Sequence, residues 1–335
     1  MNWVPLPRDL DPTFDALAGA APESGFMQSS GWAAFKRLEG LDVLRLGLFE
    51  GRDLTGGASL LRLPAAEPQF IVCPEGPVLP WGDEAKARSA LRSLTEHVRA
   101  ESGPELLGLR IEPHLEPPRP SLLRNWAKSP VDLTPVHTPY LDLSLGDEAF
   151  LAQMSPKGRY NLRLARRHGV EVFRTQAVGP LKSFYMLFEE TSRRNDFFAE
   201  PIGFFLNLAS TLFPADMAQL YLARHQGEIL AGILVVFFGR RATYLYGASS
   251  IVRREVMPNY PLHWEAMRDA RKRGCIEYDL YGYDPFDRPD HQYAGITRFK
   301  KQWGGMRRDR VGGLDFVFYD RLADEVAARL AQQGP

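Results

Sequence analysis

The sequence contains one strand-like stretch that leads through a loop to a phenylalanine and a lysine. Residues Tyr278 to Tyr283 alternate between apolar and polar, and a loop rich in proline and aspartate then precedes Phe299 and Lys300. Lys300 therefore carries a positive charge just beyond the predicted sheet. A fixed positive charge can stabilise the oxyanion that forms during acyl transfer, so Lys300 is the first candidate for a catalytic residue.

Two adjacent arginines, Arg193 and Arg194, precede the aromatic pair Phe197 and Phe198. The planar guanidinium group binds phosphate oxygens bidentately, which makes this segment a candidate site for a diphosphate. The aromatic residues belong either to that site or to the hydrophobic core, and the sequence leaves both interpretations open.

A third group of candidates is basic. Residues 157–167 have helical spacing, which turns Leu162 and Ala165 inward. The outward positions hold Lys157, Arg159, Arg163, Arg166 and Arg167. Such a stripe suits the phosphates of an A-form RNA helix, because proteins hold these helices mainly by backbone contacts. A solvated helix face explains the pattern equally well.

Composition limits the classes of protein to which the chain can belong. Of its 335 residues 44% are hydrophobic, which is enough for the cores of two globular domains. The 41 basic and 41 acidic residues balance, which argues against a dedicated DNA-binding protein. The sequence shows no signal peptide and no membrane-spanning run, so we expect a cytoplasmic protein. Cys73, Cys275 and the histidines form no metal-binding pattern, and we expect neither a metal ion nor a cofactor.

The order of predicted elements occurs twice. The first copy has strands at 43–49, 60–63 and 69–73, a helix at 83–102 and a strand at 106–111. The second has strands at 219–224, 229–238 and 241–246, a helix at 261–273 and a strand at 275–280. Helical segments at 28–38 and 181–213 precede the two copies, and a proline-rich linker spans 116–139. The repetition indicates a duplicated α/β module.

This element order resembles the core of the GNAT acyltransferases, which implies two tandem GNAT-like α/β domains with mixed sheets flanked by helices. In that fold the backbone amides of a glycine-rich loop hold the pyrophosphate of coenzyme A at a helix N-terminus. The corresponding loop of the second copy, 253–260, has no glycine, and prolines remove donors from the loop of the first copy, 75–80. A coenzyme A site is therefore disfavoured in both copies.

Motifs along most of the chain resemble those of the FemABX family, which transfers amino acids from aminoacyl-tRNA to peptidoglycan precursors. The resemblance rests on the order and spacing of the motifs rather than on any single one. They are Gln28 to Trp32, Lys36, Gly76-Pro77-Val78, Lys157 to Asn161, Gly169-Val170, Thr191-Ser192-Arg193, Tyr246 to Ser249, Tyr278-Asp279 and Phe299-Lys300. No heptad run interrupts the second copy, so the chain resembles the shorter members that lack a coiled-coil arm.

The resemblance implies an acceptor-binding site. In the family, a helix lysine and an arginine hold the diphosphate of the precursor, and these correspond to Lys36 and Arg193. Spacing alone gives Lys36 a plainer interpretation as a solvated helix lysine. The remaining acceptor-binding candidates are Thr191, Phe197 and Tyr246, with Tyr244 as the alternative to Tyr246. Phe197 replaces a tyrosine found in the family, so one hydroxyl contact is expected to be missing.

The resemblance also implies the catalytic residues. Phe299 and Lys300 form the family signature nearest to the chemistry, and Glu112 stands where family members carry an aspartate before proline. A lysine-type acceptor amine must lose a proton before it attacks, which costs about 4.6 kcal/mol at pH 7 at about 1.36 kcal/mol per pKa unit. Glu112 is the candidate base, and proton transfer through the terminal tRNA hydroxyls is the alternative. Lys301 joins the basic stripe as a tRNA contact.

We therefore expect a monomeric peptidyltransferase with aminoacyl-tRNA as donor and UDP-MurNAc-pentapeptide or lipid II as acceptor. Lipid II would imply peripheral membrane association. The strand 314–319 and the helix 321–331 are too short to form a domain, and the family resemblance implies that they return to the first module. The acceptor-binding domain is therefore predicted at 1–145 plus 312–335. The donor and catalytic domain is predicted at 146–311. The alternatives are an N-acyltransferase with a thioester donor, a non-catalytic RNA-binding module and transfer to a protein N-terminus.

Overall fold

The computed structural model describes residues 1–63, 69–291 and 293–322, and the chain divides into two compact units. Unit 1 comprises Met1–Val136 and the chain from Asp309 onward, and unit 2 comprises His137–Arg308. The boundaries fall before the predicted 145/146 and 311/312, because the strand at His137–Asp142 pairs with Glu277–Asp279 in the sheet of unit 2. None of the described helices is long and apolar enough to cross a membrane.

The elements of unit 1 are, in chain order, β1 (Asn2–Pro5), η1 (Arg8–Leu10), α1 (Asp11–Ala20), η2 (Phe26–Gln28), α2 (Ser30–Leu38), β2 (Asp42–Glu50), β3 (Asp53–Arg62), β4 (Gln69–Pro74), α3 (Glu84–Glu101), β5 (Leu106–Glu112), η3 (Ser121–Leu123), β6 (Ala127–Lys128) and β14 (Leu314–Val317). The strands form one sheet in the order β1-β2-β3-β4-β5-β14-β6.

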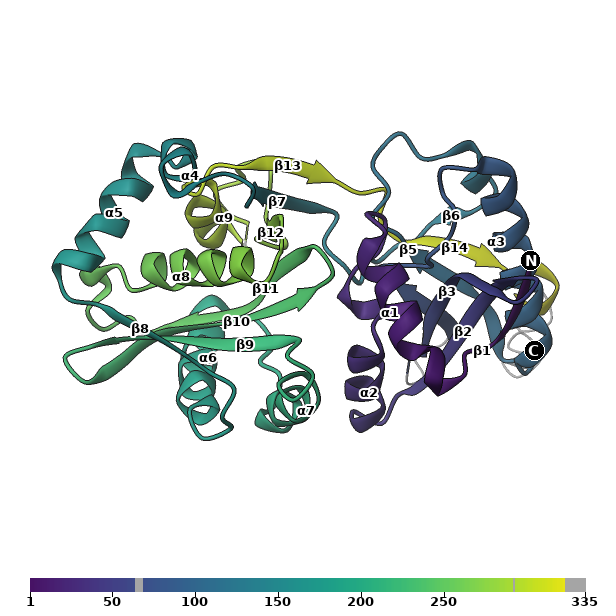
Figure 1. The fold of residues 1–335 in the computed structure, drawn as a ribbon, viewed down its shortest axis with the longest axis horizontal. Helices are drawn as coiled ribbons and strands as arrows, with labels where there is room; N and C mark the ends of the chain where they lie inside the picture. The colour runs from purple at the N-terminus through teal and green to yellow at the C-terminus, as the bar shows by residue number, and fades with distance from the viewer. Residues whose placement is uncertain (64–68, 292, 323–335) are drawn as a thin grey trace, which may run out of the picture. The chain divides into compact units, whose positions relative to one another are not determined.

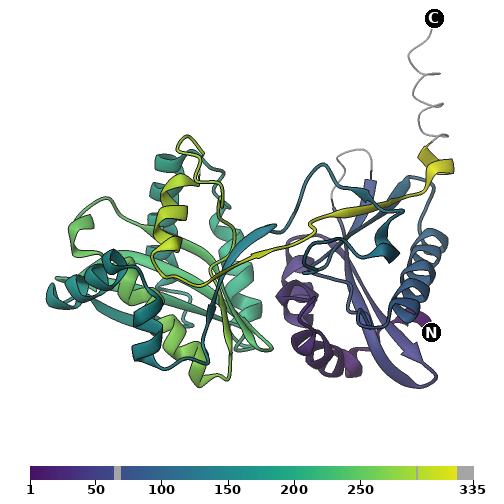
Figure 2. The ribbon, with the colours of Figure 1, turned by 90° about the horizontal axis from the view of Figure 1, so that it is seen from above.

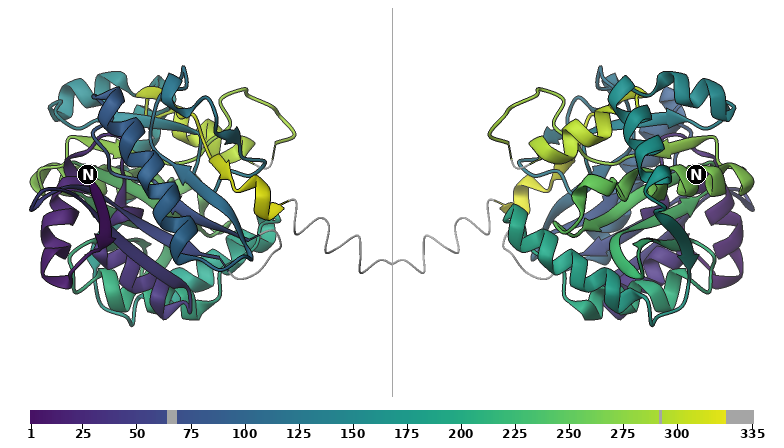
Figure 3. Two further views of the ribbon diagram at one scale, coloured as in Figure 1. Left: turned by 90° about the vertical axis from the view of Figure 1, so that its right-hand side faces the viewer. Right: turned by 90° about the vertical axis from the view of Figure 1, so that its left-hand side faces the viewer.

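Helices cover both faces of this sheet, with α3 on one side and α1 and α2 on the other (Figure 2). Side chains alternate along each strand, so neighbouring residues reach different cores. Ile71 packs into the cluster that contains Leu91 and Leu94 of α3, whereas Val72 packs with Ala33 of α2. Figure 3 (left) shows α3 lying across its face of the sheet. The helix begins where Asp83 accepts a hydrogen bond from the Lys86 backbone N–H.

The elements of unit 2 are β7 (His137–Asp142), α4 (Asp147–Gln153), α5 (Pro156–Arg167), β8 (Glu171–Thr175), α6 (Leu181–Asn195), α7 (Ile202–Leu212), β9 (Ala218–His225), β10 (Glu228–Phe238), β11 (Arg241–Ser249), η4 (Arg254–Val256), α8 (Asn259–Lys272), β12 (Glu277–Asp279), α9 (Ala294–Lys301) and β13 (Met306–Asp309). Their sheet has the order β13-β7-β12-β11-β10-β9-β8.

The sheet of unit 2 is also covered on both faces. In Figure 1, α8 lies on one face, and α6, beside which α7 packs, lies on the other. The large core of the unit joins α8 residues such as Leu262 and Met267 to the strands. Gly274, at φ 84°, ends the α8 segment in the left-handed region that glycine tolerates.

The two sheets repeat one arrangement. Strands β2-β3-β4-β5 and β9-β10-β11-β12 have the same order, and in each set the last two strands are parallel and are joined by a helix, α3 or α8. Because the parallel pair needs a crossover connection, each helix returns the chain across the sheet. The structure thus shows the repeated module that the sequence indicates.

Some elements differ from the sequence prediction. The segment 181–213 contains two helices, because Asp196 adopts φ 52° after α6 and Pro201 precedes α7. β1 and α1 were not predicted. The predicted helix at 321–331 lies outside the described residues from residue 323 onward.

Candidate functional site

Lys300 lies in the last turn of α9, a helix that follows the loop expected from the sequence. Its side chain is only 5% exposed. Nζ donates a hydrogen bond to the backbone oxygen of Gly282 over 2.6 Å and lies 5.3 Å from the centre of the Tyr244 ring. The lysine thus enters the interior of unit 2 from a helix.

The Lys300 side chain lies where two parallel strands separate. β11 and β12 pair only from Arg241 and Glu277 to Thr243 and Asp279. β11 then continues, whereas the chain after β12 turns away at Tyr281, whose φ of 62° is rare for a residue other than glycine. Strain of this kind is often found at functional sites. The Tyr281 backbone N–H donates to Asp279 Oδ1 over 2.7 Å, which fixes the turn.

Burial determines the charges in this region. It lowers the pKa of Lys300 to about 7, although the Asp279 carboxylate acts in the opposite direction. Burial and the neighbouring Lys300 together lower the pKa of His263 to about 3, so the imidazole is neutral. Lys300 can therefore be an ammonium that stabilises an oxyanion or an amine that accepts a proton.

Aromatic residues fix the position of α9 against α8. The Phe299 ring centre lies 5.4 Å from that of Tyr260 and 5.2 Å from that of His263. His263 Nδ1 lies 3.1 Å from the Tyr278 hydroxyl. The sequence analysis did not select His263, because a single histidine on the apolar face of a helix carries no motif. Phe299 acts here through packing.

A β-bulge directs two tyrosines to opposite faces of the sheet. Leu234 pairs with Tyr246 and Val235 with Tyr244, so Leu245 is an extra residue on β11. Tyr244 packs in the core with α8, and its ring centre lies 4.5 Å from that of His263. Tyr246 instead contacts the Phe205 ring of α7 at 5.1 Å. The sequence could not decide which of the two tyrosines belongs to the acceptor site, because the ordinary alternation of a strand places both on one face of the sheet.

Three acceptor-binding candidates lie near the end of α6. The Phe188 ring contacts both Phe197 and Tyr246, with ring centres 5.7 Å apart in each case. Thr191 Oγ1 accepts a hydrogen bond from the Ser249 backbone N–H and donates to its oxygen, both at 3.2 Å. Thr191 thus fixes the end of β11. The fourth candidate, Arg193, is exposed in the last turn of the same helix.

The fifth acceptor-binding candidate, Lys36, lies on α2 of unit 1 and is half-buried. Its Nζ lies 4.8 Å from the Phe35 ring centre and 5.2 Å from the Trp32 ring centre. The Ser29 hydroxyl accepts a hydrogen bond from the Trp32 backbone N–H and begins the helix. These contacts hold a charged side chain beside two aromatic rings.

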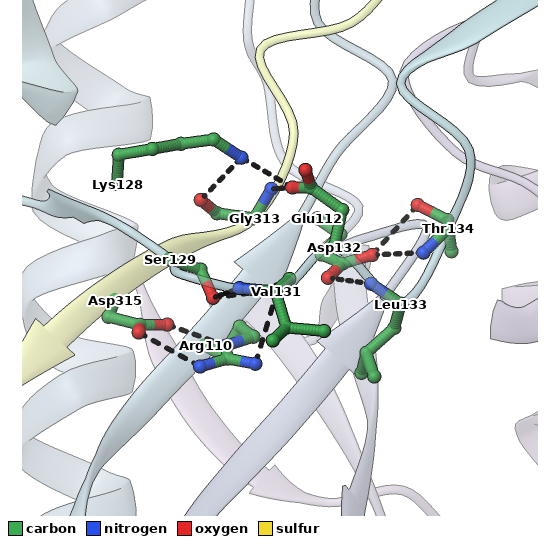
Figure 4. Close-up of polar contacts among 10 residues, drawn as sticks. All are labelled: Arg110, Glu112, Lys128, Ser129, Val131, Asp132, Leu133, Thr134, Gly313 and Asp315. Carbon is green, nitrogen blue, oxygen red and sulfur yellow. Dashed lines mark hydrogen bonds and ion pairs between the residues drawn. The ribbon is translucent and has the colours of Figure 1, made fainter. Parts of the chain in front are cut away.

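Glu112 is buried in unit 1 and is only 1% exposed. Its carboxylate accepts hydrogen bonds of 2.8 Å from the Leu133 N–H, the Thr134 N–H and the Thr134 hydroxyl (Figure 4). Burial raises the pKa of Glu112, and the hydrogen bonds act against that rise. The nearby Asp132 accepts a hydrogen bond from the Gly313 N–H over 2.6 Å. Glu112 therefore anchors the linker beside the chain that leads to β14.

The basic candidates differ in how far their side chains are engaged within the fold. Arg159 donates to the oxygens of Leu151 and Ala152 over 3.3 Å each, at the C-terminal end of α4. Lys301 pairs with Asp287. Four basic side chains are exposed on α5, namely Lys157, Arg163, Arg166 and Arg167. Arg163 also donates to the Arg159 oxygen over 3.3 Å, and the Arg166 guanidinium lies 5.4 Å from the Trp264 ring centre. The exposed group is smaller than the predicted stripe.

Three backbone amides of the loop before α8 are engaged within the protein. The Val256 and Met257 N–H groups donate to the oxygens of Arg253 and Arg254 over 3.1 Å each, and the Tyr260 N–H donates to the Met257 oxygen. Val256 is buried beneath the loop. These three amides are therefore not available to hold a pyrophosphate.

Comparisons with known proteins agree on the architecture. A family model described as "FemAB family" matches residues 11–116, and one described as "Acetyltransferase (GNAT) domain" matches residues 156–301. The solved structure of FemX has a TM-score of 0.87 at 21% identity and covers 97% of this chain and 100% of that one. A tandem GNAT protein from the clavulanic acid biosynthesis pathway has a TM-score of 0.56 at 12% identity and covers 94% of this chain and 98% of that one. These likenesses confirm the two GNAT-like domains.

Curated relatives match nearly the whole chain. The lipid II:glycine glycyltransferase of Staphylococcus haemolyticus (strain JCSC1435) is 24% identical over 400 residues, which cover 95% of this chain and 94% of the relative. The protein of the same name from Staphylococcus aureus (strain MRSA252) is 23% identical over 402 residues, with the same coverage. The similarity thus extends across both units.

Proposed function

The chain belongs to the FemABX family, and we propose that it transfers an amino acid from aminoacyl-tRNA to a side-chain amine in the stem peptide of a peptidoglycan precursor. The observation that carries the proposal is the similarity over 95% of the chain to lipid II:glycine glycyltransferases. The proposed acceptor is lipid II or its soluble precursor UDP-MurNAc-pentapeptide, and the product begins an interpeptide bridge. The reaction takes place in the cytoplasm, where aminoacyl-tRNA is available.

Aminoacyl-tRNA is favoured over a thioester as donor for two reasons. Three backbone amides of the loop before α8 are engaged within the protein, which argues against a pyrophosphate site there. Lys157, Arg163 and Arg166 are exposed on one helix, and their charges suit RNA phosphates. We propose that these three bind the tRNA. Arg159 is half-buried and donates to oxygens at the end of α4, and Lys301 pairs with Asp287, so both serve this role less directly.

In the proposed reaction, the neutral acceptor amine attacks the carbonyl carbon of the aminoacyl ester. The carbonyl oxygen gains negative charge, and Lys300 as an ammonium stabilises this oxyanion. The carbon–oxygen bond to the terminal ribose then breaks, an amide bond forms, and the ribose oxygen leaves with a proton. Phe299 supports this step by holding α9 in place.

The acceptor proton needs a base. Glu112 was the predicted base, but three donors of the linker already occupy its buried carboxylate, which favours the anchoring role. We propose that the proton passes through the terminal hydroxyls of the tRNA. Arg193 and Lys36 are proposed to bind the phosphates of the acceptor, and Phe197 and Tyr246 to line the acceptor site near Arg193. Thr191 positions this segment through its contact with Ser249.

The test is transfer from labelled aminoacyl-tRNAs to lipid II in detergent and to UDP-MurNAc-pentapeptide. We expect one aminoacyl-tRNA to give a labelled acceptor, and ribonuclease treatment of the donor to abolish it. A matched reaction with acetyl-CoA tests the alternative N-acyltransferase, which the GNAT match favours. Product from acetyl-CoA alone would replace the proposal, and tRNA binding without consumption of the ester would indicate an RNA-binding module.

A further inference from the structure

Tyr244 lies in the core of unit 2, beside His263 and Lys300. Its side chain is 9% exposed and lies between two groups of the site. The His263 ring centre is 4.5 Å from the Tyr244 ring centre, and Lys300 Nζ is 5.3 Å from the same point. Tyr244 therefore lies directly beside the proposed catalytic lysine.

The Tyr244 hydroxyl has no hydrogen-bond partner among the described residues, which sets it apart from the other tyrosines of the same core. Tyr221 donates to Asp269 Oδ2 over 2.6 Å, Tyr260 donates to Gln302 Oε1 over 2.6 Å, and the Tyr278 hydroxyl lies 3.1 Å from His263 Nδ1. The Tyr244 hydroxyl oxygen is not among the fully buried polar atoms without a partner, so it has some accessible surface through which a ligand can reach it.

The backbone next to Tyr244 leaves space for this hydroxyl. A Cβ atom on Gly247 would lie 1.9 Å from the Tyr244 hydroxyl oxygen, so no larger residue fits at position 247 without moving the tyrosine. The bulge at Leu245 directs Tyr244 toward Lys300 while Tyr246 faces α6 and α7. Glycine and bulge together place the hydroxyl on the Lys300 side of the sheet.

We propose that Tyr244 is a second catalytic residue, whose hydroxyl donates a hydrogen bond to the oxyanion that Lys300 stabilises. This inference rests on the proposed function, because it assigns a further donor to the same tetrahedral intermediate. A phenol and an ammonium from neighbouring side chains can supply two donors to one oxygen.

The protonation of Tyr244 agrees with this role. Burial raises the pKa of Tyr244 above its ordinary value, so the hydroxyl keeps its proton at any pH at which the enzyme works. The neighbouring Tyr278 is also kept protonated by burial, and His263 is neutral. Lys300 is thus the group near Tyr244 that changes charge around neutral pH.

The test compares Tyr244→Phe with Tyr221→Phe. Tyr244→Phe removes a hydroxyl that has no hydrogen-bond partner among the described residues, so we expect little change in thermal stability and a saturated transfer rate lower by about 10²–10³-fold. The acceptor KM should change less than threefold. Tyr221→Phe removes a hydroxyl that is bonded to Asp269, and it should lower stability while the transfer rate stays within threefold.

A tetrahedral phosphonate that joins an acceptor amine analogue to an adenosine donor analogue provides an independent measurement. Tyr244→Phe should raise the dissociation constant of this phosphonate by about the same factor as it lowers the transfer rate. Phosphonate binding and the transfer rate both depend on stabilisation of the transition state. A transfer rate within twofold of the wild type, or a loss confined to KM, would overturn the role of Tyr244 and leave the proposed function intact. No transfer by the wild-type protein from any aminoacyl-tRNA would overturn both.

Discussion

At the scale of single residues, the burial of Lys300 links chemistry to stability. An ammonium aimed at a developing oxyanion acts on the transition state more than on either substrate. The Lys300 side chain is held by Gly282 and Tyr244, whereas that of its neighbour Lys301 is exposed and pairs with Asp287. The two adjacent lysines therefore have different environments and serve as a matched pair.

Lys300→Met should lower the single-turnover rate at saturating donor and acceptor by about 10²–10³-fold, the usual effect of losing one oxyanion donor. Acceptor affinity measured by calorimetry should stay within threefold, because the charge acts in the transition state. Lys301→Met is the control and should retain most of the rate. A Lys300→Met protein as fast as the wild type would remove Lys300 from the chemistry.

The lowered pKa of Lys300 also predicts how stability depends on pH. In the unfolded chain the amine holds its proton up to about pH 10.5, whereas in the folded protein it releases it above about pH 7. Below pH 7 the amine is protonated in both the folded and the unfolded protein, so the buried charge destabilises the fold to its full extent. Between pH 7 and 10.5 this destabilisation decreases as the pH rises. Lys300→Met should therefore stabilise the protein more at pH 6 than at pH 9, by about 1–3 kcal/mol. Denaturant unfolding at both pH values measures this, and an equal effect at both would contradict the shift.

At the scale of elements, one helical glycine allows α5 to meet the end of α9. A Cβ atom on Gly158 would lie 2.6 Å from the backbone oxygen of Gln302, which accepts a hydrogen bond from the Ser155 N–H. The contact is continued by Asn161, which donates to the Tyr260 hydroxyl over 2.9 Å. The helix that carries Lys300 thus depends on a small residue in a neighbouring helix.

Gly158→Ala should destabilise the protein by about 1–3 kcal/mol, because the backbone at Gln302 must move. Gly203 on α7 is the matched control, since a Cβ atom there meets nothing within 4 Å. Gly203→Ala should stabilise by about 0.5–1 kcal/mol through helix propensity alone. Thermal unfolding of both variants measures the difference, and equal shifts would refute the close contact.

Glu112→Gln tests whether this residue anchors the linker. The new side-chain amide has one oxygen and one NH₂ group, so its N–H would face the Leu133 or Thr134 N–H and leave that donor without an acceptor. We therefore expect a loss of about 1–3 kcal/mol in stability. The transfer rate at a temperature where the variant is folded should stay within threefold. Glu116→Gln, at an exposed position of the same linker, should change neither. A rate lower by a hundredfold with unchanged stability would restore Glu112 as the base.

Much of this architecture follows from hydrophobic periodicity, which indicates α3, α8 and the strands of both modules. β1 and α1 escape detection because proline and aspartate obscure their apolar pattern. The position of Phe299 and Lys300 on a helix follows from tertiary packing against Tyr260 and Trp303, which no local signal records. The contact of Tyr244 with Lys300 depends on an extra residue in β11. This bulge changes which face of the sheet each following side chain points to, and no residue pattern in the sequence indicates it.

At the scale of the whole molecule, the two units differ in how the chain builds them. Unit 2 is one continuous segment with its own core, whereas unit 1 needs β14, which pairs with β5 and β6. Residues 137–308 should fold alone, with cooperative unfolding in calorimetry. A chain that ends at residue 308 should keep the unit 2 transition and lose that of unit 1. Loss of both transitions would show that neither unit is autonomous.

The late position of β14 has a consequence for synthesis on the ribosome. β5 leaves the ribosome long before β14 does, and at about 5–20 residues per second the interval is on the order of ten seconds or more. During that time β14 has not yet been made, so the edge of β5 with which it will pair is open. An open strand edge can pair with other chains. The nascent protein is thus most exposed to aggregation while its second half is being made, and chaperones that shield strand edges should raise its yield.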